Sequence, residues 1–112
     1  MKLVEVAKQM DAEMKLKGHA TRTLERGLRI SLFERTDDIV LVMERPAALV
    51  MPSELEVRIV KDAFFGDSPL KEIKHPNATL VTNMGCLLYE KRKVYLSVSK
   101  EDYNAKIGRA HV

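Results

Sequence analysis

The chain has few of the residues that form disulfides or bind metal ions in small domains. Among its 112 residues there is one cysteine, Cys86, and no tryptophan. A single cysteine excludes an internal disulfide framework and any zinc site built from several thiolates, and it suits the reducing cytoplasm, where we expect the protein to reside. The five glycines are scattered singly, a pattern typical of turns and helix ends, so a glycine-rich phosphate loop is also excluded.

Long apolar segments are absent as well. The apolar runs fall far short of the roughly 18 residues that span a bilayer, and the acidic Glu5 interrupts the region where a secretory signal needs an apolar run. With 46% hydrophobic and 31% charged residues, the composition is that of an ordinary soluble domain. We therefore expect one domain and no membrane partner.

The last residues of the chain match the translation of a DNA sequencing adaptor. Residues 107–112 are the translation of a common short-read sequencing adaptor, and the codon for Lys106 fits the two bases in front of it. We interpret 106–112 as adaptor read-through and 1–105 as a single domain, an N-terminal fragment if the reading frame continues. Without Lys106 and Arg109 the chain has 17 basic and 16 acidic residues, so the net charge falls from +3 to +1. The argument from basicity to a nucleic-acid partner weakens accordingly.

The N-terminal segment has the pattern of an amphipathic helix. Apolar residues recur every three or four positions from Leu3 to Met14, and charged residues cover the other positions. Gly18 is a typical left-handed stop, so this helix should end near Lys17.

A second helix is predicted to run to about Phe65. Ser53 and Glu56 form a capping box at its start, and Gly66 supplies the stop. The alternative is a strand, because Leu55 and the apolar residues that follow it also alternate. The helix is favoured because the cap and the stop agree with it.

The remaining apolar segments are typical of strands. Three lie between the two helices and three follow the second one, after a polar connection over 71–77: they are 19–23, 28–33, 39–43, 79–82, 86–89 and 94–98. Ser99 and Asp102 resemble another capping box, so a third helix should begin there. We predict an α+β fold, in which an antiparallel sheet is packed on one face by helices, in the order α-β-β-β-α-β-β-β-α. The expected core residues include Leu3, Met10, Leu28, Ile30, Leu41, Leu55, Ile59, Leu80, Leu88 and Leu96.

The chain offers little for catalysis or metal binding. His19 and His75 have no second histidine or cysteine at ligand spacing, and Cys86 lies in a predicted strand, where a buried and inert thiol is expected. Asp37 and Asp38 fit a hairpin turn better than a cation site. We therefore expect no metal, no cofactor and no enzymatic activity, the alternative being an enzyme whose remaining catalytic residues lie beyond residue 105.

Two groups of residues are candidates for binding. The first is basic: it joins an arginine cluster to a charged hairpin tip between two tyrosines, a pattern that contacts phosphates and stacks on bases. Its members are Arg22, Arg26, Arg29, Lys91, Arg92, Lys93, Tyr89 and Tyr95. The second is an adaptable partner surface formed by Met10 and Met14 on the first helix. We expect a protein-binding or adaptor module that associates with another protein or with itself; the alternative is a nucleic-acid-binding domain.

Overall fold

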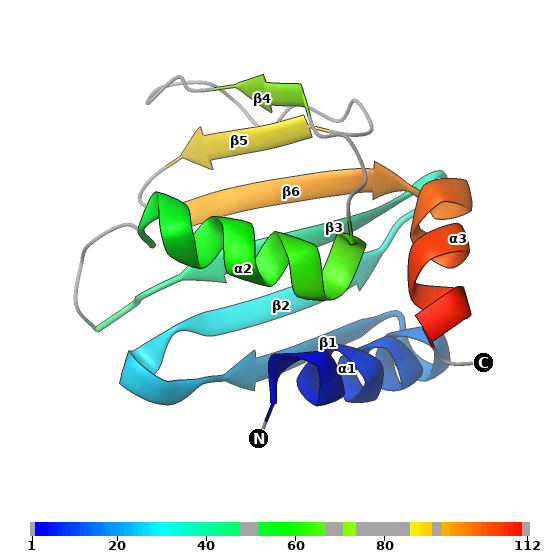
Figure 1. The fold of residues 1–112 in the computed structure, drawn as a ribbon, viewed down its shortest axis with the longest axis horizontal. Coiled ribbons are helices and arrows are strands. Elements are labelled where there is room, and N and C mark those ends of the chain that lie inside the picture. The colour runs from blue at the N-terminus through cyan, green and yellow to red at the C-terminus, as the bar shows by residue number, and fades with distance from the viewer. Residues whose placement is uncertain (1, 48–51, 67–70, 74–85, 91–92, 111–112) are drawn as a thin grey trace.

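Three helices and one sheet make up the described part of the chain (Figure 1). The structure is a computed structural model, and it describes residues 2–47, 52–66, 71–73, 86–90 and 93–110. Along the chain the elements are α1 (Leu3–Lys17), β1 (His19–Thr23), the short helical turn η1 (Glu25–Gly27), β2 (Arg29–Glu34), β3 (Asp38–Glu44), α2 (Glu54–Phe65), β4 (Lys71–Ile73), β5 (Cys86–Glu90), β6 (Lys93–Ser99) and α3 (Lys100–Ala110). The predicted α+β class is confirmed, and the order of the elements roughly matches the prediction.

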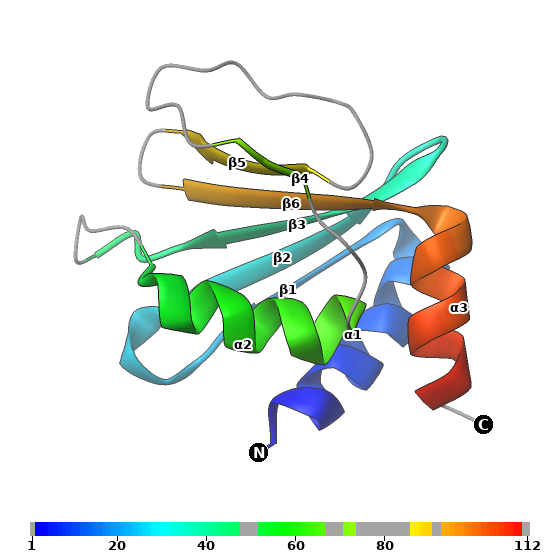
Figure 2. The same cartoon turned by 45° about the horizontal axis from the view of Figure 1, so that its top comes forward.

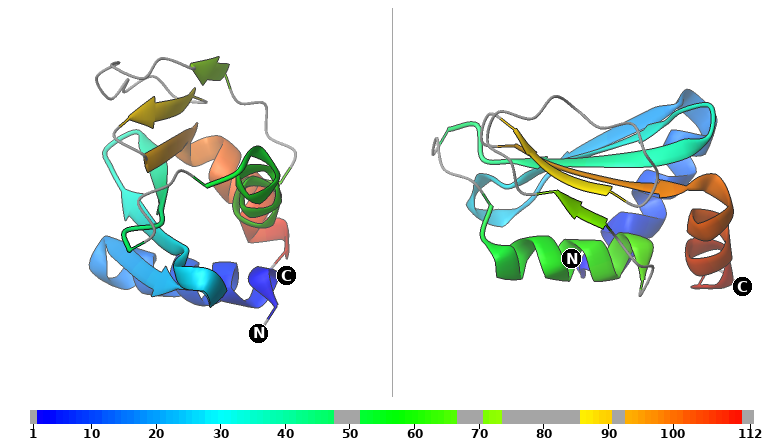
Figure 3. Two further views of the ribbon diagram at one scale, coloured as in Figure 1. Left: turned by 90° about the vertical axis from the view of Figure 1, so that its left-hand side faces the viewer. Right: turned by 90° about the horizontal axis from the view of Figure 1, so that it is seen from above.

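The sheet has the strand order β1-β2-β3-β6-β5-β4. Its neighbouring strands run antiparallel except β4 and β5, which pair in parallel. All three helices lie on one face of this sheet, as Figure 2 and the view from above in Figure 3 show. The predicted antiparallel sheet with helices on one face is therefore present, and the parallel pair β4–β5 is a departure from the prediction.

One strand departs from the prediction. Lys71–Ile73 pairs with β5 as β4, whereas the polar sequence of this segment suggested a connection. Three residues are too few to show an alternation, so the pairing with β5 decides the conformation here. The strand that we predicted over 79–82 lies outside the described residues.

Local signals place the end of α1 and both ends of α2. Gly18 ends α1 at a φ of 88°, and its N–H donates to the carbonyl of Met14. At the start of α2 the Ser53 hydroxyl accepts from the Glu56 N–H at 3.2 Å, and the Glu56 carboxylate accepts from the Ser53 N–H at 2.9 Å. The strand alternative for this segment is thus wrong, because both bonds of the capping box are formed.

The core lies between the sheet and the helices, and α2 faces it differently from the prediction. Val57, Val60 and Phe64 point into the core, where they join residues such as Leu41 and Leu96. The predicted core members Leu55 and Ile59 are instead 64% and 51% exposed. Their burial was predicted wrongly, because α2 carries two overlapping apolar stripes and only one of them can face the sheet.

A buried hydrogen bond joins the two ends of the described chain. The Asp102 N–H donates to the Ser99 hydroxyl at 3.0 Å, which confirms the predicted cap of α3. One residue later, the buried Tyr103 hydroxyl donates to Asp11 Oδ1 on α1 at 2.6 Å. Burial, and then the neighbouring carboxylate of Asp11, raise the pKa of Tyr103. This bond anchors α3 to α1 across the helical layer.

Candidate binding groove

A groove of about 590 Å³ opens between α1, α2 and the end of the β1–β2 hairpin. This volume is within the range of sites that hold small molecules or peptide side chains. Most of its lining is apolar, and this part consists of Leu3, Val6, Leu24, Leu28, Ile59 and Val60. The polar groups on the lining are Gln9, Arg22, Thr23, Glu25 and Glu56. The groove therefore combines an apolar floor with a small number of polar side chains.

Exposed apolar side chains continue the groove along α2. Ile59 lines the groove and Leu55 lies one helical turn before it; we call this pair the α2 stripe. An apolar helix stripe that is left in water costs free energy, and covering the two side chains would recover about 1 to 2 kcal/mol each. The stripe and the groove together place exposed apolar side chains beside an apolar concavity.

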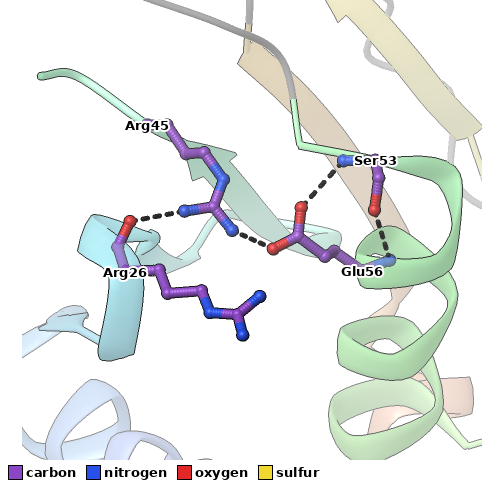
Figure 4. Close-up of polar contacts among 4 residues, drawn as sticks. All are labelled: Arg26, Arg45, Ser53 and Glu56. Atoms are coloured by element: carbon purple, nitrogen blue, oxygen red, sulfur yellow. Dashed lines mark hydrogen bonds and ion pairs between the residues drawn. The ribbon is translucent and has the colours of Figure 1, made fainter. Parts of the chain in front are cut away.

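Arg45 joins the hairpin turn to the start of α2, next to the groove-lining residues Glu25 and Glu56 (Figure 4). Its guanidinium donates to the backbone carbonyl of Arg26 in the hairpin turn and forms an ion pair with Glu56 at the start of α2. The Ser53 N–H, and with it Arg45, hold the pKa of the Glu56 carboxyl below its ordinary value. The clamp, which we define as Arg45, Glu56 and the Arg26 carbonyl, fixes the hairpin turn relative to α2.

Sequence reasoning did not single out Arg45. Glu56 was assigned only to the capping box, where one of its carboxylate oxygens does act. The other oxygen meets Arg45, which is 11 residues earlier in the chain. No local pattern encodes such a contact, because it exists only once β3, the hairpin turn and α2 are assembled.

A second ion pair lies beside the groove on the β1 side. Arg22 extends from β1 to Glu13 on α1, with 3.1 Å between Nη2 and Oε1. The hydrogen bond from Arg22 holds the pKa of the Glu13 carboxyl below its ordinary value. The same guanidinium also donates to the carbonyl of Thr21 at 2.8 Å. Arg22 is thus bound both to α1 and to the backbone of its own strand.

The described members of the predicted basic group are divided between the two sides of the sheet and the hairpin turn. Arg22 lies on the helical side of the sheet, whereas Arg29 and Lys93 lie on the open side, and both of these pair with Glu44. Arg26 occupies the hairpin turn. Tyr95 is half-buried in β6; the side chain of Tyr89 lies outside the described part of the structure, as do Lys91 and Arg92. Glu44, which pairs with both Arg29 and Lys93, offsets much of the positive charge that a nucleic acid would meet on the open side.

The predicted methionine surface is placed elsewhere. Met10 and Met14 are 0% and 1% exposed and pack in the core between α1 and the sheet. The helical spacing of the two methionines was predicted correctly, but both lie on the side of α1 that faces the core. Their burial removes both side chains from the candidate surface, which we place instead at the groove and the α2 stripe.

The carboxylates considered for a cation are used otherwise. Asp38, one of the two aspartates considered, accepts from Arg35 through both oxygens, at 2.7 and 2.9 Å. Glu44, on the same strand, pairs with Arg29. Within the described ranges, histidine, cysteine and carboxylate side chains do not gather in any group of three or more that could hold a metal ion. His75 and the side chain of Cys86 fall outside those ranges.

Comparison with protein-family models, with curated proteins and with solved structures finds no match for the chain. No described helix is long and apolar enough to cross a membrane.

Proposed function

We propose that this chain is a protein-binding module that holds an apolar segment of another polypeptide in the groove and against the α2 stripe. The observation that carries the proposal is the exposure of Leu55 and Ile59 beside a largely apolar groove. A helix in a small domain normally turns its apolar residues inward, and an exposed apolar patch next to a concavity is typical of a binding surface.

The composition of the groove supports a polypeptide partner. Protein interfaces combine a buried apolar centre with a polar rim, and a few large side chains contribute most of the binding free energy. Here Leu24 and Ile59 offer the apolar contacts, while Gln9 and Glu25 line the same groove with hydrogen-bonding groups. One or two apolar anchors of a partner would fill the groove, and neighbouring polar groups would orient it.

A selection experiment tests this proposal. A random peptide library displayed on phage is selected against the full chain, and the enriched peptides are then measured against two variants. Ile59→Lys places a charge at the groove, whereas Leu16→Lys makes the same change at a residue on α1 that is 82% exposed and does not line the groove. We expect Ile59→Lys to weaken binding about tenfold or more, and Leu16→Lys to leave it unchanged. Equal binding to both variants would contradict the proposal.

Self-association is the variant of this function in which a second copy covers the α2 stripe. It predicts that light scattering gives a dimer mass that returns to the monomer mass in Ile59→Lys and Leu55→Lys. If the wild-type chain is strictly monomeric, a second copy is not the partner, and the proposed partner is a different polypeptide.

Nucleic-acid binding is the alternative class of function. It predicts affinity that falls steeply with salt, and a smaller salt dependence after charge reversal at Arg92. Absence of binding to single-stranded and double-stranded DNA and RNA at low salt would reject it.

A further inference from the structure

The edge of the sheet next to the groove has backbone groups that point away from the sheet. β1 is the first strand in the sheet order, so among the described strands it has a neighbour on one side only. The Leu24 N–H donates to the Leu28 carbonyl, and the Glu34 N–H donates to the Gly18 carbonyl. Because directions alternate along an antiparallel strand, the even-numbered residues of β1 bond to β2. The N–H and C=O groups of His19, Thr21 and Thr23 therefore face the outer edge.

Arg22 occupies the middle of this edge. Its guanidinium donates to the Thr21 carbonyl at 2.8 Å while it pairs with Glu13 on α1. A charged side chain folded over an edge strand is a common means of preventing unwanted strand pairing. The side chain is about one third exposed, so an incoming chain has access to it and can take its place on the carbonyl.

The groove begins where β1 ends. Arg22, Thr23 and Leu24 all contribute to its lining, and Leu3 and Ile59 lie on its other walls. Side chains alternate between the two faces of a sheet, so a strand added beside β1 would direct every second side chain inward. The inward side chain opposite Leu24 would enter the apolar groove, and the outward ones would lie next to Thr21, whose hydroxyl contacts Ser31 at 3.2 Å.

We propose that the β1 edge accepts an extended segment of a partner protein as an additional antiparallel strand, with alternate apolar side chains inserted into the groove. This inference rests on the proposed function and specifies the conformation and pattern of the partner: apolar and polar residues in alternation over about five positions. A helical partner would fill the groove but would form no hydrogen bonds with the edge-facing N–H groups of Thr21 and Thr23. A second copy of β1 presents Ala20 and Arg22 on the inward face, a methyl group and a charge, which do not fill an apolar groove.

Peptides methylated on the backbone test the inference. The probe is a fluorescent synthetic peptide, Lys-Thr-Leu-Thr-Leu-Thr-Leu-Thr-Lys, titrated against the full chain by fluorescence anisotropy. In antiparallel pairing with the leucines inward, the N–H groups of the probe threonines face β1 and those of its leucines face solvent. N-methylation of the threonines should weaken binding about tenfold or more, and N-methylation of the leucines should have little effect. Equal effects of the two modifications would overturn the inference.

Amide hydrogen exchange on the protein provides the complementary measurement. Binding of the probe should slow exchange at Thr21 and Thr23 about tenfold or more, whereas Ala20 and Arg22, whose amides already face β2, should change little. Bound probe without this protection would overturn the added strand. If the probe binds without protecting Thr21 and Thr23, and Ile59→Lys abolishes this binding, the groove binds peptides in another conformation. The proposed function then stands. If neither this probe nor any selected peptide binds, both proposals fall.

Variants at the edge residues Thr21 and Arg22 give a mutational test of the same point. Thr21→Pro removes an edge-facing N–H, and Thr21→Val is its matched control because it keeps the N–H and the branched side chain. The probe should bind Thr21→Val as it binds the wild type and should bind Thr21→Pro about tenfold more weakly. Arg22→Ala should bind the probe about threefold or more tightly, since the Thr21 carbonyl is then unoccupied. Weaker binding by Arg22→Ala would contradict the role given to Arg22.

Discussion

Replacing Tyr103 with phenylalanine removes one buried hydrogen bond and leaves the packing in place. The hydroxyl donates to Asp11 Oδ1 at 2.6 Å, and both residues are almost fully buried. The ring keeps its edge contact with Phe65, whose centroid is 6.0 Å away, and Lys15 keeps its ion pair with the other Asp11 oxygen at 3.3 Å. A hydrogen bond to a charged group contributes about 1.5 to 3 kcal/mol, so the free energy of unfolding should fall by that amount. The corresponding fall in Tm is roughly 6 to 24 °C.

Urea unfolding followed by circular dichroism measures this loss. Tyr95→Phe is the matched control, because Tyr95 is half-buried on the open face of the sheet and the same atom is removed. We expect Tyr95→Phe to stay within about 0.5 kcal/mol of the wild type. A loss below about 0.5 kcal/mol in Tyr103→Phe would show that the hydrogen bond to Asp11 does not stabilise the fold, since the hydroxyl would then contribute no more than an exposed one.

Three further predictions concern the turn, the cap and pH. Arg26 has a φ of 63°, a left-handed conformation that asparagine adopts more readily, so Arg26→Asn should raise the free energy of unfolding by about 0.5 to 1 kcal/mol in urea titrations. Ser53→Ala removes the acceptor for the Glu56 N–H and should cost about 1 kcal/mol, where a change below about 0.3 kcal/mol would show that the cap is dispensable. Because the pKa of Tyr103 is raised in the folded chain, the stabilisation linked to its proton is complete below about pH 10 and is lost as the pH rises further. Unfolding at pH 8 to 11 should therefore show a steeper alkaline loss in the wild type than in Tyr103→Phe, and parallel curves would contradict this.

Local signals predicted the helices well because their determinants lie within a few residues. The capping box of Ser53 and Glu56, and Gly18 at the end of α1, act over one helical turn. The side of α2 that faces the sheet was not predictable in this way. Both Leu55 with Ile59 and Val57 with Val60 satisfy helical spacing, and only the approach of the sheet selects between them.

The binding groove was beyond prediction because it is assembled from distant segments. Its walls come from residues 3–9, 22–28 and 56–60, and nothing in any one of these segments marks a concavity. Arg22 was singled out for its charge, yet its contacts with Glu13 and the Thr21 carbonyl assign it to the edge of β1. The sequence alone identified residues with binding chemistry but could not tell which of them share a surface.

We propose that the groove between α1, α2 and the β1–β2 hairpin is where this protein holds a partner polypeptide. Methyl NMR spectra of the full chain, titrated with a peptide from the phage selection, test it most directly. We predict shifts for the methyl groups of Leu3, Leu24 and Ile59, which line the groove, and none for Val42 on the open face of the sheet. Shifts confined to the open face, or a bound peptide that leaves the groove methyl groups unchanged, would show that the partner binds elsewhere.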